Sequence, residues 1–158
     1  MSIKERLKHK YALSEQGAND MIKAVIVVTI ANLAFMFPVG LLYLLASDIL
    51  AGGIPSSKLP MYIVGMVVSV LLIIITTYFQ YNATFLATYV ESGIRRRTLA
   101  EKLRKIPLSF FGKKDLSDLT STIMGDCAWL ETASSHFFPQ LFGSMCSTTI
   151  VTICLFFF

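Results

Sequence analysis

The sequence predicts an all-α membrane protein with three transmembrane helices, of which the second and third continue well beyond the lipid as cytoplasmic extensions. More than half of the 158 residues are apolar, and the mean hydropathy is +0.64. The apolar residues are clustered, and no Asp, Glu, Lys or Arg occurs in 24–47, 59–90 or 132–158. Because about 20 apolar residues suffice to cross a bilayer as a helix, each of these three stretches predicts one span.

The distribution of basic residues predicts the orientation of the spans. Five basic residues precede the first span and eight lie between Arg95 and Lys114, whereas the loop at 48–60 contains only Lys58. Short loops rich in Lys and Arg stay in the cytoplasm. We therefore expect a multi-pass protein of the plasma membrane with a cytoplasmic N-terminus. The same bias accounts for the net charge of +4, so the expected partner is the lipid bilayer and not nucleic acid.

The N-terminal region, 1–23, reads as a charged cytoplasmic tail followed by an interfacial helix, with Ser14 as its N-cap. A flexible linker is the alternative for this segment. A single membrane domain is expected to fill 24–158. Its first span, about 21–46, contains Pro38, which is expected to kink the helix. Turn-forming Gly, Pro and Ser residues at 48–60 then predict a short outer loop.

The second span, about 61–90, belongs to a longer predicted helix. No proline interrupts 61–106, and a helix of that length would measure roughly 70 Å. The hydrocarbon core is only about 30 Å thick. More than half of this helix should therefore project into the cytoplasm, up to Pro107, which is expected to end it.

Polar side chains occupy the inner half of the second span, and one amide lies in the first. They are either part of a cavity wall or members of a packed polar seam between helices, and the sequence favours neither. For Asn32 taken singly, a structural hydrogen bond to a neighbouring helix is the favoured role. The candidate cavity-lining residues are Asn32, Gln80, Tyr81, Asn82 and Thr84.

The loop at 91–133 carries two adjacent phenylalanines, Phe110 and Phe111, which begin three residues after Pro107. Burial of each is worth about 1.5–3 kcal/mol, so both are expected to dock against another surface. A new helix is expected to start at 115–118 and to lead into the third span, about 134–158. Because this span ends on Phe156, Phe157 and Phe158 without any flanking charge, the chain is expected to be a truncated part of a longer protein.

The tip of this loop resembles the first intracellular loop of exporter-type ABC transporters. The similarity lies in Leu103-x-x-Ile106-Pro107-Leu108-Ser109-Phe110-Phe111-Gly112 and in the following Ser117-Asp118-Leu119-Thr120-Ser121-x-Ile123-x-x-Asp126. Ser117 stands where the family usually has Gly, and Thr122 where Arg is frequent. Further along, Glu131, His136, Pro139 and Gln140 resemble a bacterial branch of that fold, multidrug-like, which includes iron-siderophore transporters.

The resemblance implies a partial ABC exporter transmembrane domain that lines part of a translocation pathway. It further implies that the tip is a coupling helix bound by a cytoplasmic ATPase domain, formed by Phe110, Phe111, Gly112, Lys113, Lys114, Asp115, Leu116, Ser117 and Asp118. ATP and Mg²⁺ are expected at that nucleotide-binding domain, in the full-length chain or in a partner, and a second transporter half should complete a homodimer or heterodimer.

The chain itself carries no phosphate-binding glycine-rich motif and no spacing typical of metal ligands, so no catalytic or metal site is expected within it. The alternative hypothesis is a small standalone protein with three spans, whose basic loop recruits a cytoplasmic partner.

Overall fold

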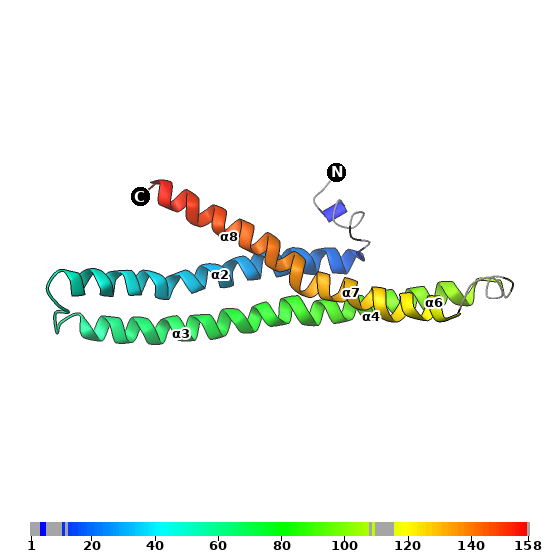
Figure 1. Cartoon of the computed structure of the whole chain (residues 1–158), viewed down its shortest axis with the longest axis horizontal. Helices are drawn as coiled ribbons and strands as arrows, with labels where there is room; N and C mark the ends of the chain where they lie inside the picture. The colour runs from blue at the N-terminus through cyan, green and yellow to red at the C-terminus, as the bar shows by residue number, and fades with distance from the viewer. Residues whose placement is uncertain (1–3, 6–10, 12, 108, 110–115, 158) are drawn as a thin grey trace.

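The computed structural model describes residues 4, 5, 11, 13–107, 109 and 116–157. Three helices in this part of the chain are long and apolar enough to cross a membrane, namely Glu15–Leu50, Leu59–Arg104 and Ser117–Phe157. They are long rods in an elongated molecule: the first two run side by side, and the third crosses the first and diverges from it towards the C-terminus (Figure 1). The prediction of an all-helical chain with three helices that could each span a membrane is thereby confirmed for the described residues.

The first rod is α2 (Glu15–Leu50), which contains Pro38 and runs without a break. Ser14 is its N-cap, as predicted, and its side chain accepts a hydrogen bond from the backbone N–H of Gly17. Residues 15–23, which were expected to belong to a separate interfacial helix, are therefore the first part of the helix that forms the first span. The outer loop turns at Gly52 and Gly53, whose φ angles of 120° and 119° favour glycine.

The second rod consists of α3 (Leu59–Tyr81), the π-helical turn η1 (Asn82–Leu86) and α4 (Ala87–Arg104). Its 46 residues correspond to roughly 70 Å, as the sequence predicted. The third rod follows as α6 (Leu116–Ser121), η2 (Thr122–Asp126), α7 (Cys127–Thr132), η3 (Ala133–Phe137) and α8 (Phe138–Phe157). The π-helical turns were not predicted.

Small residues allow the rods to approach α2 closely. The buried positions of α2 recur at helical spacing and are mostly small: Gly17, Ala18, Met21, Ala24, Val28, Ala31 and Ala34. Both α3 and α8 pack against α2. A Cβ atom added at Gly143 of α8 would lie 2.5 Å from Cγ1 of Val28, so α8 fits against α2 only because this residue is glycine.

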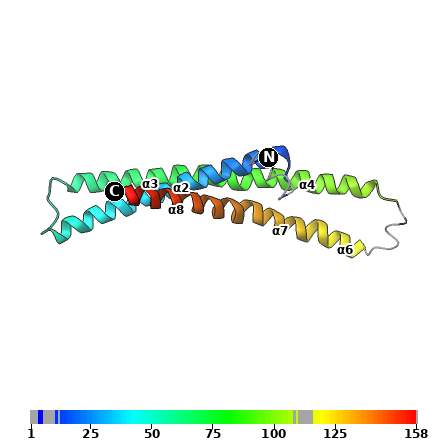
Figure 2. The same cartoon turned by 90° about the horizontal axis from the view of Figure 1, so that it is seen from above.

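Most apolar side chains of the three rods point outward. Leu42, Ile63 and Ile153 are each more than half exposed, and such exposure continues along all three spans. In a bilayer these side chains contact lipid or further helices. The hydroxyls of Ser69, Thr76 and other residues donate to backbone carbonyls of their own helices, which satisfies them without water. Figure 2 shows the rods from above, with α4, α6 and α7 at the end opposite the outer loop.

Candidate functional site

The five candidate cavity-lining residues lie in three separate grooves. Gln80, Tyr81 and Thr84 line one groove, together with Phe35 of α2 and with His136 and Gln140 of the third rod. Asn82 lines a second groove that also contains Asp20 and Lys23. Asn32 lines a third, against α8. The first and third grooves both include Phe35, whereas the groove of Asn82 shares no residue with either.

The groove that contains Gln80, Tyr81 and Thr84 has a volume of about 300 Å³ and mixes aromatic with polar groups. It lies where η1 and η3 come into contact, and the ring of Phe85 meets that of His136 edge to face at 4.9 Å. Thr84 is buried and donates to the carbonyl of Gln80, whereas Tyr81 is 55% exposed. π-Helical turns occur frequently at functional sites, so this groove is the best candidate for a binding surface in the part of the chain that the structure describes.

Asn32 takes the role favoured for it in the sequence analysis. Its Nδ2 lies 3.5 Å from Oγ of Ser144 and 3.4 Å from Oγ of Ser147, both on α8. These long hydrogen bonds join α2 to α8 within an apolar environment. Asn32 is therefore a contact between helices in this structure.

Most of the predicted coupling tip lies outside the described residues. This applies to Phe110, Phe111, Gly112, Lys113, Lys114 and Asp115. Leu116 begins α6, as expected for a helix starting at 115–118, and Ser117 and Asp118 are exposed on it. On the near side of the tip, α4 ends at Arg104, three residues before Pro107.

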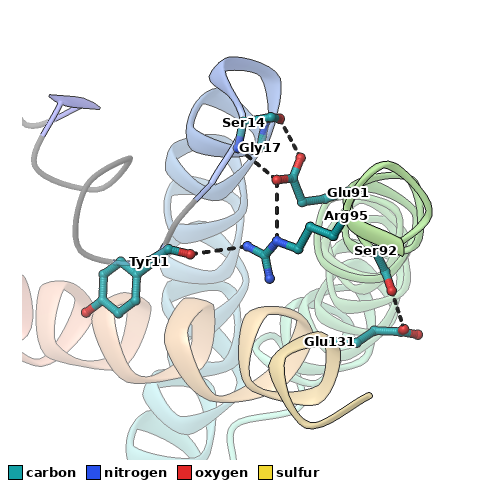
Figure 3. A network of polar contacts seen from close by, with 7 residues as sticks. All are labelled: Tyr11, Ser14, Gly17, Glu91, Ser92, Arg95 and Glu131. Atoms are coloured by element: carbon teal, nitrogen blue, oxygen red, sulfur yellow. Dashed lines mark hydrogen bonds and ion pairs between the residues drawn. The ribbon is translucent and has the colours of Figure 1, made fainter. Parts of the chain in front are cut away.

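The most tightly bonded polar site is one that the sequence analysis missed, a joint between α2 and α4. Its central residue is Glu91 of α4, which is only 6% exposed. Glu91 Oε1 accepts a hydrogen bond from the backbone N–H of Ser14 at 2.8 Å, and Glu91 Oε2 accepts one from the Ser14 hydroxyl at 2.5 Å. Figure 3 shows the carboxylate of Glu91 pointing at the first turn of α2.

Arg95, one turn further along α4, binds on the other side of this carboxylate. Its Nε lies 3.7 Å from Glu91 Oε1, and its Nη2 donates to the backbone carbonyl of Tyr11 at 3.3 Å. The Tyr11 ring in turn packs on Phe138 of α8, with ring centroids 4.5 Å apart. We call Tyr11, Ser14, Gly17, Glu91 and Arg95 the Glu91 joint; it connects the start of α2 with both other rods.

A second pair of side chains on the adjacent face of α4 binds the third rod. Ser92 Oγ donates to Glu131 Oε2 at 2.6 Å, and Arg96 Nη2 donates to the same oxygen at 3.1 Å. Glu131 belongs to α7. Because the two pairs are offset by one residue, Arg95 of α4 binds at the start of α2 and Arg96 binds Glu131 of α7. Figure 3 shows Ser92 pointing at Glu131 on the side of α4 that faces α7.

Two signals in the sequence could have pointed to the Glu91 joint. Glu91 is the first charge after the 32 residues of 59–90, on a helix that continues past it. In addition, Ser14 is an N-cap whose third following residue, Gly17, cannot supply the carboxylate of a capping box. The sequence does not show that these two features lie close together in space, because they are 77 residues apart along the chain.

Chemically, the joint holds groups together and offers no reactive centre. Its carboxylate is already bonded to Ser14 and paired with Arg95. Over the residues that the structure describes, no group of three or more His, Cys, Asp or Glu could hold a metal ion. The chain matches no protein-family model, and neither curated proteins nor solved structures show a significant similarity to it.

Proposed function

We propose that the chain is the N-terminal part of the membrane domain of an exporter-type ABC transporter. It forms part of a translocation pathway and connects that pathway to a cytoplasmic ATPase domain. One observation carries the proposal: helices of 46 and 41 residues, each far longer than a bilayer is thick, pack against each other through α4 and α7 beyond the charge-free stretches. Stiff rods of this kind can carry a displacement over tens of Å.

In this proposal the pathway surface is the groove at η1 and η3, which Gln80 and Gln140 line together with aromatic side chains. Uncovered amides are costly against lipid, so further helices or a second transporter half, of the same or a different chain, would close the groove. ATP and Mg²⁺ would bind the ATPase domain, in the full-length chain or in a partner. This chain would contribute movement and no catalysis.

The proposed orientation puts the N-terminus and the α4–α7 end in the cytoplasm of a plasma-membrane protein, because the basic residues gather there. Single cysteines at Lys58 and Lys102, with the native cysteines replaced, test it. We expect a membrane-impermeant maleimide to label Lys58→Cys in intact cells and Lys102→Cys only after lysis. The reverse pattern would contradict the orientation.

The coupling tip is tested with Phe110→Ala/Phe111→Ala in the full-length transporter. We expect membrane insertion to persist while ATP hydrolysis no longer drives transport, because the apolar groups proposed to anchor the tip are lost. The matched control is Phe156→Ala/Phe157→Ala, since these two adjacent phenylalanines are each 87% exposed.

Unchanged coupling in the tip variant would contradict the coupling role. If purified membranes with the intact protein show no ATPase activity at all, and a cytoplasmic protein without nucleotide-binding motifs is captured through the basic loop, the function is instead that of a three-span recruiting protein.

A further inference from the structure

We propose that Glu91 caps α2 in trans, that is, from another helix of the same chain. We further propose that this contact passes a movement of α4 directly to the first span. The bond itself is independent of the proposed function, whereas its use in transmission rests on it. The Glu91 joint would thus be the point at which the cytoplasmic rods act on α2.

The geometry at the start of α2 is that of a capping box divided between two helices. In an ordinary capping box the N-cap side chain binds the N–H of the third residue after it, and the acidic side chain of that residue binds the N–H of the cap. Ser14 performs the first half, since Gly17 N donates to Ser14 Oγ at 2.9 Å. The second half comes from Glu91, which accepts from Ser14 N.

Gly17 is the residue that makes room for this arrangement. A Cβ atom added there would lie 2.6 Å from both Cδ and Oε2 of Glu91, and the three nearest heavy atoms all belong to the Glu91 carboxyl group. The carboxylate from α4 thus fills the space in which a side chain at position 17 would stand. Sequence and structure agree that the cap of α2 is incomplete within its own helix.

Apolar packing fixes the start of α2 against α8, while polar contacts hold it against α4. Leu13, Ala18 and Met21 form a buried cluster, with Tyr11, Phe138 and Phe142 packed against it. Arg95 is 18% exposed and contacts both Glu91 and the Tyr11 carbonyl. The first turns of α2 therefore cannot stay in place when α4 moves, unless these contacts break.

The joint also provides a shorter route from α4 to α2 than the chain does. Along the chain, α4 reaches α2 only through η1, the whole of α3 and the outer loop. The joint connects them directly, five residues past the end of η1. A tilt of α4 about this π-helical turn would therefore move the start of α2. Since Phe35 of α2 lines the groove, the wall of the groove would move as well.

The cap is tested by hydrogen–deuterium exchange of residues 13–18 in the full-length protein in lipid nanodiscs. We expect exchange about tenfold faster in Glu91→Ala than in wild type, because loss of a cap costs about 1–2 kcal/mol. Glu101→Ala, at an exposed position of the same helix, is the control and should leave exchange unchanged. Equal exchange in Glu91→Ala and wild type would overturn the trans cap.

A compensated variant separates capping from transmission. Gly17→Glu combined with Glu91→Ala places the acidic residue where an ordinary capping box has it, in the space that Glu91 leaves. We expect protection of residues 13–18 to return. The contact between residue 91 and α2, however, stays broken. If Glu91 only stabilises the protein, the variant should behave like wild type; if Glu91 also transmits movement, transmission should remain lost.

Transmission is measured as nitroxide distances from Ser57 in the outer loop to Gln16 on α2 and to Arg97 on α4, with and without ATP and vanadate and with the native cysteines replaced. In wild type both distances should change. In Glu91→Ala and in the compensated variant only the distance to Arg97 should change. If the distance to Gln16 still responds in the compensated variant, transmission through Glu91 is refuted.

Absence of any response at Arg97 in wild type would overturn the proposed function and the transmission step together. The exchange measurement would then still decide the trans cap by itself, so the two failures are distinguishable.

Discussion

One polar cluster joins α2 to α4 and another lies at the outer loop between α2 and α3, and the two differ in the burial of their central residues and in the sequence distance that they bridge. The inner cluster, the Glu91 joint, is buried and connects residues 77 positions apart. In the outer cluster, Lys58 Nζ lies 2.8 Å from Asp48 Oδ1, and the Tyr62 hydroxyl donates to Asp48 Oδ2 at 2.6 Å. These partners are only 10 and 14 residues apart, and the side chain of Lys58 is 47% exposed.

The difference indicates which cluster shapes the molecule. The outer cluster reinforces a turn that Gly52 and Gly53 already enforce through their positive φ angles. The inner cluster brings together helices that no short loop connects, so their relative position depends on the side chains themselves. Removing a buried partner leaves the other group uncompensated, whereas an exposed ion pair is replaced by water at little cost.

Arg95→Ala should have the largest effect on stability. It removes a mostly buried guanidinium, and with it the cation beside the Glu91 carboxylate and the hydrogen bond to the Tyr11 carbonyl. We expect a loss of about 2–3 kcal/mol in the free energy of unfolding, measured by SDS titration in bicelles. Arg97→Ala, at an exposed position two residues away, should change it by less than about 0.5 kcal/mol. Equal losses in both variants would mean that the joint is no stronger than an ordinary surface contact.

Gly17→Ala should have the next largest effect on the free energy of unfolding. Whether it destabilises or stabilises the protein should depend on Glu91. In wild type the new methyl group displaces the carboxylate from Ser14, which should cost about 1–2 kcal/mol. In the Glu91→Ala background the same change only replaces Gly by Ala within a helix, which should stabilise by about 0.5–1 kcal/mol. A double-mutant cycle of unfolding free energies measures this reversal. Stabilisation in both backgrounds would refute the close approach of Glu91 to Gly17.

Much of the fold could be predicted from the sequence, because it depends on local or compositional features. Charge-free stretches predicted the three long apolar helices, Ser14 the start of α2, and Pro107 the end of α4 near Arg104. The Glu91 joint and the ion pair of Arg96 with Glu131 could not be predicted, because both depend on how separate rods rotate against each other. The π-helical turns leave no clear residue signal in the sequence. The coupling tip stays a prediction, since residues 110–115 lie outside the described part.

Glu131→Gln should have a smaller effect than either change at the Glu91 joint. Glutamine can still accept the hydrogen bond from Ser92, while the charge that pairs with Arg96 is lost. Because Arg96 is 41% exposed, solvent screens the pair, and we expect a loss of about 0.5–1 kcal/mol in the free energy of unfolding. Adding salt should reduce the difference from wild type. A loss as large as that of Arg95→Ala would show that the contact between α4 and α7 is as strong as the contact between α4 and α2, against the expectation.

Asp48→Asn, at the outer end, should have the smallest effect, and one that depends on pH. Asp48 lies beyond the predicted first span, and its hydrogen bonds from Lys58 and Tyr62 lower the pKa of its carboxyl group below the ordinary value of about 3.9. A lowered pKa in the folded state means that the contribution to stability is complete above about pH 4 and is lost as the pH falls further. Thermal unfolding of wild type and Asp48→Asn should therefore differ slightly at pH 7 and converge towards pH 3. A difference that grows on acidification would show that Asp48 is held in its protonated form, and the contrast between the two clusters would then need a different physical basis.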